Sequence, residues 1–155
     1  MEQVCVGVDI GGTSVKLGIF TLNGDLLKKW EIPTEPKNDP KALIEKIGKS
    51  IKETLKEARL TLTDCVGVGM GVPGPVMPNG FIEVVVNIGW REVFPARILS
   101  DLLAGMPVAL GNDANVAALG EAWMGGAKHQ QDSVMVTLGT GVGGGIIIDG
   151  KIVPG

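Results

Sequence analysis

The sequence has 155 residues, with 14 Lys and Arg residues against 17 Asp and Glu residues and a formal net charge of −3. A chain of this length suits one domain, which buries about 70% of the surface of its unfolded state. No basic patch with interleaved aromatic residues is present, so we expect no nucleic-acid partner. The apolar runs are too short to cross a bilayer, and no positively charged leader precedes them, which predicts a cytoplasmic protein with no membrane partner.

Glycine and cysteine usage adds two constraints. The 24 glycines are about twice the number expected from an average usage of ~7%. They gather at the ends of apolar runs, which favours tight turns where a ligand approaches the backbone. Cys5 and Cys65 lie in apolar, strand-like runs without CxxC spacing, so we expect buried free thiols in a reducing cytosol.

The first forty residues predict an antiparallel meander. Its three strands are expected at residues 4–10, 15–21 and 26–32. The turn residues Gly11, Gly12 and Thr13 separate the first two strands, and an Asn-Gly pair at 23–24 separates the next two. Three prolines in the segment 31–40 predict an exposed connection.

Asp39 and Pro40 supply an N-cap and a first-turn proline, which predict the start of a helix. Apolar residues then recur at helical spacing, with Lys and Glu on the other face. The apolar face consists of Ile44, Ile47, Ile51, Leu55 and Ala58. We therefore expect an amphipathic helix that packs on the sheet.

The middle of the chain alternates strands with turns. A strand is predicted at 65–70, and the following GVPGP sequence at 71–75 predicts a rigid turn or loop. After an Asn-Gly turn, residues 81–86 again predict a strand. A helix beginning at Pro95 and capped by Gly105 completes this part.

The third part of the chain begins with a strand at 108–110, a turn at Gly111 and an Ala-rich helix from Asp113 to about Met124. Strands are expected at 133–138 and 145–148, joined by a glycine loop. The pattern of residues 8–20 recurs at 136–148, which suggests two related halves that each open with a glycine-turned hairpin. Hairpins combined with helical crossovers predict an α/β fold with a mixed sheet.

The glycine loop at 139–144 satisfies GxGxxG, but its context excludes the common alternatives. A dinucleotide fold requires a helix directly after the loop, and here an Ile run predicts a strand. Residues 145–151 resemble a Walker A loop, yet Ile152 stands where Ser or Thr is required. A protein-kinase glycine loop would need a lysine-bearing strand behind it, and none follows. Two glycine hairpins that hold a triphosphate from two sides remain as the interpretation.

Five ordered motifs together resemble the ROK family of sugar kinases, in the actin-like ATPase (ribonuclease H-like) superfamily, and most closely its bacterial glucokinases. They are DIGGT at 9–13, GVPGPV at 71–76, NIGW at 87–90, GNDAN at 111–115 and LGTGVGG at 138–144. The resemblance implies an ATP-dependent hexose kinase that phosphorylates the 6-hydroxyl of glucose. The alternatives are a sugar-sensing ROK regulator, for which no helix-turn-helix precedes Val4, and a non-catalytic sugar-binding domain.

The resemblance also implies residue roles. Asp113 would be the catalytic base, although a helix N-cap is the alternative, and Asp9 would help to place Mg²⁺. The predicted sugar-binding residues are Gly71, Asn87, Asn112 and Asp113. The predicted ATP-binding residues are Asp9, Gly11, Gly12, Thr13, Lys16, Gly139, Thr140, Gly141 and Gly143. Lys16 would meet a phosphate or point to solvent, and Trp90 and Trp123 are expected to pack rather than to stack on sugar.

Family members are longer than this sequence. Their Glu-x-Gly-His segment, zinc-binding cysteines and nucleotide-base pocket follow the second glycine loop and are not present here. We therefore expect an N-terminal fragment, with a small α/β domain at 1–112 and the truncated start of a related large domain at 113–155. The apolar edge at 146–153 is expected to favour a homo-oligomer. The sequence leaves open which hexose is used and whether ATP or polyphosphate is the phosphoryl donor.

Overall fold

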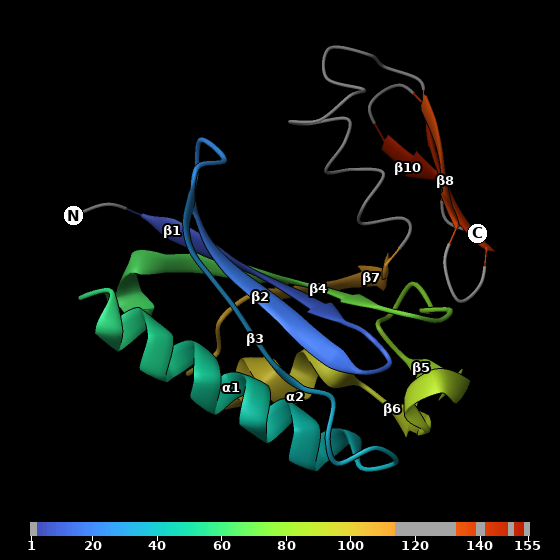
Figure 1. Cartoon of the computed structure of the whole chain (residues 1–155), viewed down its shortest axis with the longest axis horizontal. Coiled ribbons are helices and arrows are strands. Elements are labelled where there is room, and N and C mark those ends of the chain that lie inside the picture. The colour runs from blue at the N-terminus through green and yellow to red at the C-terminus, as the bar shows by residue number, and fades with distance from the viewer. Residues whose placement is uncertain (1–2, 114–132, 139–141, 149–150, 154–155) are drawn as a thin grey trace.

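The computed structural model describes residues 3–113, 133–138, 142–148 and 151–153. Figure 1 shows its elements in chain order. The strands are β1 (Val4–Ile10), β2 (Ser14–Thr21), β3 (Leu26–Pro33), β4 (Cys65–Val72), β5 (Ile82–Val85), β6 (Trp90–Val93), β7 (Val108–Asn112), β8 (Ser133–Leu138), β9 (Val142–Ile148) and β10 (Lys151–Val153). The helices are α1 (Pro40–Glu57), α2 (Pro95–Leu102) and the short 3-10 turns η1 (Leu62–Asp64) and η2 (Val86–Ile88).

Five strands form a mixed sheet in the order β3-β2-β1-β4-β7. The predicted meander is confirmed, because β1 pairs antiparallel with β2 and β2 pairs antiparallel with β3. Strands β4 and β7 are parallel to β1. Helical crossovers link the parallel strands, so the carboxyl ends of β1, β4 and β7 meet at one edge of the sheet.

Helix α1 begins as predicted. The Asp39 side chain accepts a hydrogen bond from the backbone N–H of Ala42 at 3.1 Å, and proline occupies the first turn. The predicted apolar residues from Ile44 to Leu55 are buried, whereas Ala58 is the exposed C-cap. Helix α2 also begins at its predicted proline, and Gly105 adopts a left-handed φ of 83° after its end.

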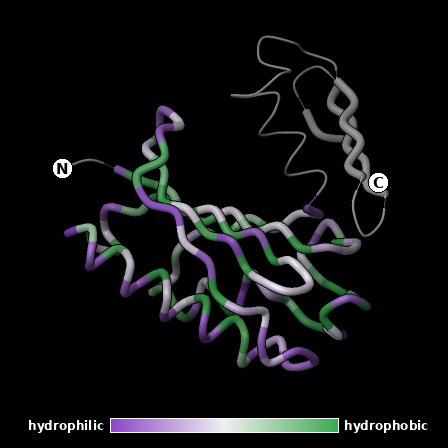
Figure 2. The backbone as a smooth tube through the Cα atoms, viewed as in Figure 1, coloured by the Kyte–Doolittle hydropathy of each residue, from purple (hydrophilic) through white to green (hydrophobic). Residues whose placement is uncertain are grey.

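Both long helices cover the same face of the five-stranded sheet (Figure 1). The core lies between the sheet and these two helices. It contains Val4, Val6, Val8 and Ile10 of β1 together with the apolar residues of α1 and α2. Figure 2 shows hydrophobic stretches along the strands and an alternation of hydrophobic and hydrophilic residues along α1. Strand β1 is therefore buried on one face only, and its alternate residues Cys5, Gly7 and Asp9 face the other side.

The predicted repeat is confirmed in strand topology. Strands β8, β9 and β10 form a second antiparallel meander in the order β10-β9-β8. This order matches β3-β2-β1 of the first sheet, so each half begins with the same hairpin arrangement. Strand β10 was not predicted; the apolar segment at 146–153 contains the pairing of β9 with β10.

Three predicted strand ends were wrong, each near a glycine. Strand β4 continues through Gly71 and Val72, although the Pro-Gly sequence predicted a loop from residue 71. Strand β7 likewise continues through Gly111, because its backbone pairs with β4 in register. Strand β9 begins at Val142, so Gly143 belongs to a strand instead of a loop. In each case ladder hydrogen bonds override the weak strand propensity of glycine.

No helix in the described part of the chain is both long and apolar enough to span a membrane.

Candidate functional site

The candidate site lies where the parallel strands β1, β4 and β7 end. Asp9 of β1 pairs in register with Gly71 of β4, and Gly71 pairs in register with Gly111 of β7. Asp113 follows β7 directly. The two carboxylates therefore come from strands separated by one glycine-bearing strand, at the edge where ligands bind in open α/β sheets.

Asp9 has an unusual electrostatic environment. Partial burial of its carboxyl group is the largest cause that raises its pKa above the ordinary value, and the negative charge of Asp113 raises it further. The ammonium group of Lys16, whose residue pairs with Asp9 across β1 and β2, acts in the opposite direction. Asp113 and Lys16 thus both act on Asp9, although Asp113 lies far from the other two residues in the sequence.

The glycine turn at 11–13 joins β1 to β2. The N–H of Gly11 donates a hydrogen bond to the carbonyl oxygen of Ser14 at 2.9 Å. A Cβ atom added to Gly11 would lie 2.8 Å from that oxygen, whereas a Cβ added to Gly12 would meet nothing within 4 Å. Gly11 is therefore required by the turn itself. Gly12 has no such internal requirement, and the space beside it is open to a ligand.

Thr34 fixes this turn from the end of β3. Its side chain is fully buried, and its hydroxyl donates to the carbonyl oxygen of Gly11 at 2.8 Å. Its backbone N–H donates to the carbonyl oxygen of Thr13 at 2.9 Å. A role for Thr34 was not predicted from the sequence, because that role depends on a hydrogen bond to Gly11, 23 positions away. The local sequence shows only a threonine that directly follows Pro33.

Asn87 lies in η2 and is exposed. The next residues form a tight turn in which Gly89 adopts a left-handed φ of 67°. The carbonyl oxygen of Ile88 accepts a hydrogen bond from the N–H of Asn38 at 3.0 Å. Trp90 is fully buried, which confirms that it packs in the core.

Asn112 connects β7 to the loop that follows β4. Its side-chain Nδ2 donates to the carbonyl oxygen of Gly74 at 2.9 Å. Gly74 itself packs against Val85 of β5, because a Cβ added there would lie 2.9 Å from a Val85 methyl carbon. The predicted sugar-binding residue Asn112 therefore also has a structural role at this edge.

The face of the sheet opposite α1 and α2 contains a broad groove of about 1100 Å³. Asp9 and Lys16 line it, and its floor includes a row of glycines in which Gly7 pairs with Gly18 on one side and with Gly69 on the other. Gly69 is exposed, whereas the Phe20 ring lies over Gly7 and Gly18. The groove thus begins at the charged group of the candidate site.

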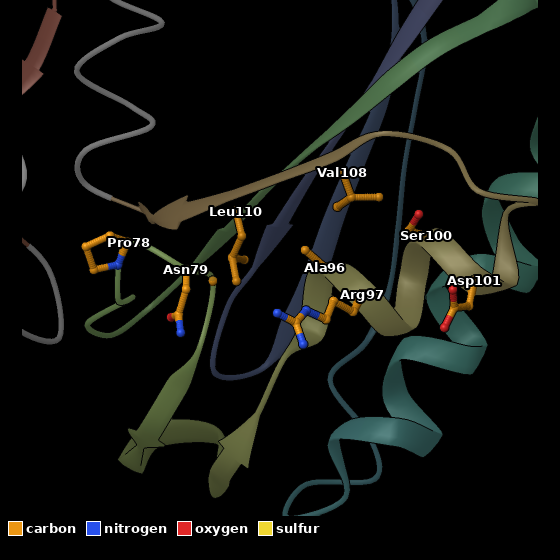
Figure 3. A pocket seen from close by; sticks show the side chains of 9 residues that line it. Pro78, Asn79, Ala96, Arg97, Ser100, Asp101, Val108 and Leu110 are labelled. Atoms are coloured by element: carbon orange, nitrogen blue, oxygen red, sulfur yellow. The ribbon is translucent and has the colours of Figure 1, made fainter.

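A second pocket of about 520 Å³ lies elsewhere, between the turn at 78–80, α2 and the edge strand β7. In Figure 3, Arg97 extends from α2 toward this turn. The Arg97 guanidinium carbon also lies 4.0 Å from the centre of the Phe94 ring. None of the residues predicted to bind sugar or ATP lines this pocket.

The structure brings together only part of the predicted site. The described residues Asp9, Gly11, Gly12, Thr13, Lys16, Gly71, Asn112 and Asp113 belong to the carboxyl edge of the sheet or to the turn beside it. Gly143 lies in β9, opposite Thr137 of β8. Gly139, Thr140, Gly141 and Trp123 lie outside the described residues, as does the predicted helix after Asp113.

Comparisons with known proteins place this geometry in context. Residues 5–155 match the ROK family. The glucokinase of Halalkalibacterium halodurans is 41% identical over 151 residues, which cover 97% of this chain and 46% of that protein. The xylose repressor of Caldicellulosiruptor bescii is 29% identical over 151 residues, which cover 97% of this chain and 38% of the repressor.

A crystal structure of a ROK family glucokinase from Streptomyces griseus, in complex with glucose and AMPPNP, superposes with a TM-score of 0.84 at 32% identity. The match covers 98% of this chain and 46% of that one. This chain therefore spans about half the length of the relatives it matches, and its mixed five-stranded sheet has the actin-like fold of the ROK kinases. By sequence and by fold, the chain belongs to the ROK family.

Proposed function

We propose that this chain carries the phosphate-binding turns and the catalytic base of an ATP-dependent hexose kinase, with glucose as the substrate. The observation that supports this most strongly is the meeting of Asp9, Asp113 and the glycine turn at one edge of the sheet. Relatives named glucokinase add support, as does the related structure that contains glucose and AMPPNP.

The turn at 11–13 is suited to phosphate binding. Gly12 leaves open space where a Cβ would stand, so a phosphate can approach the backbone closely. Thr13 is exposed and adds a hydroxyl donor, and Lys16 supplies a positive charge near Asp9. We propose that Gly139, Thr140, Gly141 and Gly143 contact the phosphates from the second hairpin.

Asp9 fits a magnesium–triphosphate. Mg²⁺ in kinase sites takes one or two carboxylates together with phosphate oxygens and water, and Asp9 offers an accessible carboxylate next to a second one. Within the described residues, no group of three or more His, Cys, Asp and Glu side chains could hold a metal by itself. This suits an ion that arrives with the nucleotide. When bound, Mg²⁺ would neutralise charge on the transferred phosphoryl group.

Asp113 is the proposed base. It would accept the proton of the sugar 6-hydroxyl as that oxygen forms a bond to the γ-phosphorus, while the bond from phosphorus to the bridging oxygen of ADP breaks. A general base contributes about 10²–10⁴-fold in rate, or about 3–5 kcal/mol of the barrier. Positioning by the glycine turns and by Asp9 must supply the rest.

Sugar hydroxyls would be bound by Asn87, Asn112 and Asp113, with Gly71 in the wall of the same site. Asn87 is exposed and available for a ligand. Asn112 is anchored through Nδ2 to Gly74, which holds its side chain in one orientation. We further propose a domain boundary near residue 112, because β7 closes the first sheet and the second meander begins with β8.

The test is ADP release with MgATP and, in turn, glucose, mannose, fructose and N-acetylglucosamine. The assay uses the 155-residue chain and an extended polypeptide in which Gly155 is followed by the remaining part of the H. halodurans glucokinase. We expect ADP release from the extended polypeptide, fastest with glucose. Absence of ADP release with all four sugars would contradict the kinase proposal.

A sugar-responsive regulator is the second candidate, supported by the similarity to the C. bescii xylose repressor. It would bind a sugar without turning over ATP. Sugar binding by the extended polypeptide in calorimetry, with no ADP release, would favour it over the kinase.

A further inference from the structure

The connection between β3 and α1 contacts two loops of the candidate site that lie far apart in the sequence. At one end, Thr34 binds the glycine turn through two hydrogen bonds, from its hydroxyl to Gly11 and from its N–H to Thr13. At the other end, the N–H of Asn38 donates to the carbonyl oxygen of Ile88. We call residues 34–38 the strap. Figure 1 shows it passing from the end of β3 to the start of α1, beside the β5–β6 segment.

The contacts at both ends are specific. Thr34 is one of the few fully buried polar residues in the described part of the chain, and its hydroxyl satisfies a backbone carbonyl. Loss of that donor would leave the part-buried carbonyl oxygen of Gly11 without this partner, which destabilises more than loss of an exposed bond. At the other end, Asn38 has a φ of 64°, which Asn tolerates better than other non-glycine residues.

Gly89 and Asn38 are in close contact. A Cβ added to Gly89 would lie 3.2 Å from the Asn38 Cα and would overlap the Asn38 side chain. The loop that carries Asn87 is therefore packed directly on the strap at Asn38. A displacement of residues 34–38 must move the glycine turn, the 86–89 loop or both.

We propose that Thr34 and Asn38 are positioning residues, and that the strap couples the geometry of the phosphate-binding turn to that of the sugar-binding loop. The coupling between the two ligands rests on the proposed function, whereas the mechanical link between the two loops does not. Neither residue needs to touch a ligand. A sugar that orders the 86–89 loop would, through the strap, also order the turn at 11–13 and lower the cost of binding the nucleotide.

Hydrogen exchange on the 155-residue chain tests the mechanical link without any ligand. Thr34→Val removes the hydroxyl but keeps the branched shape, and Thr34→Ser restores the donor. Thr21→Val is the matched control, because Thr21 is also buried and its Oγ1 accepts a hydrogen bond from the N–H of Asp25 at the far end of β2.

For Thr34→Val we expect exchange to become about 5- to 10-fold faster in peptides covering 8–15 and 84–90. Thr34→Ser should behave as the unaltered chain, and Thr21→Val should accelerate only the peptide covering 19–27. An unchanged 84–90 peptide in Thr34→Val would overturn the coupling. A uniform acceleration across the chain, equal in Thr34→Val and Thr21→Val, would overturn it as well.

AMPPNP binding with Mg²⁺ is measured by calorimetry on the same variants of the extended polypeptide, with and without glucose. We expect glucose to tighten AMPPNP binding in the unaltered extended polypeptide and in its Thr34→Ser variant, and this effect to fall at least threefold in Thr34→Val. An equal effect of glucose in all three proteins would overturn the positioning role. If the unaltered extended polypeptide binds neither ligand, the proposed function fails, and the exchange pattern then decides whether the strap couples the two loops.

Discussion

Asp9 and Asp113 interact electrostatically although 104 positions separate them in the sequence: the negative charge of Asp113 raises the pKa of Asp9. Two strand ends bring them to the same edge, with Gly71 of β4 between their strands. Two neighbouring carboxylates next to an open glycine turn are unfavourable for the empty protein. They are suited to a cation-bound polyanion, which is the form in which kinases bind ATP.

The first prediction concerns the stability cost of Asp9. Because its pKa is raised in the folded state, the folded protein holds the proton more tightly than the unfolded chain, and stability falls as pH rises through the folded-state value. Asp9→Asn should therefore raise the melting temperature at pH 7 in the absence of Mg²⁺. This advantage should vanish near pH 3, where Asp9 is protonated in both states.

Asp101→Asn is the control for Asp9→Asn, because it alters an exposed carboxylate on α2, away from the candidate site. Scanning calorimetry between pH 3 and pH 7 measures both variants. If Asp9→Asn and the unaltered chain have equal melting temperatures at pH 7, the Asp9 carboxylate does not destabilise the folded protein.

The second prediction separates two adjacent glycines. Gly12→Ala should change the free energy of unfolding by less than about 1 kcal/mol, because the added Cβ meets nothing. It should weaken Mg–AMPPNP binding to the extended polypeptide at least about tenfold, since a methyl group then occupies the phosphate approach.

Gly11→Ala is the matched variant, and it should act on stability. Its Cβ would lie 2.8 Å from the carbonyl oxygen of Ser14, and relief of such overlap typically costs about 1–3 kcal/mol. Urea unfolding and calorimetric titration measure both effects. Equal AMPPNP affinity in Gly12→Ala and the unaltered protein would show that the turn at 11–13 does not contact the nucleotide.

The third prediction concerns Asn112 as an anchor. Asn112→Ala deletes the hydrogen bond to the carbonyl oxygen of Gly74, so the free energy of unfolding should fall by about 1–2 kcal/mol. Asn23→Ala, in the exposed turn after β2, should change it by less than about 0.5 kcal/mol. Urea midpoints of the two variants that coincide would indicate that the Asn112 bond contributes no net stability.

The sequence predicted most of the first sheet because its signals are local. Alternating apolar residues, Asn-Gly turns and the Asp39-Pro40 helix start each act within a few positions, and the structure confirms all three. Strand ends at Gly71 and Gly111 were placed too early. Their extension depends on ladder pairing with a strand about forty residues away, which no local pattern reveals.

The residues of the candidate site also fall into those that local motifs predicted and those that only long-range contacts reveal. Asp9, Gly12 and Asp113 carry motif signals, and the sequence predicted them. Thr34 and Gly74 were missed, since their importance lies in hydrogen bonds to Gly11 and Asn112 that span 23 and 38 positions. The roles assigned to the predicted residues stay predictions until activity is measured.

The most direct test of the account is the turnover number of the extended polypeptide with MgATP and glucose after Asp113→Asn. This change keeps the size of the side chain and removes the carboxylate, so kcat should fall by about 10²–10⁴-fold. Asp101→Asn should leave kcat unchanged. A kcat for Asp113→Asn within about threefold of the unaltered protein, a range too small for loss of a general base, would contradict the central claim that Asp113 accepts the sugar proton.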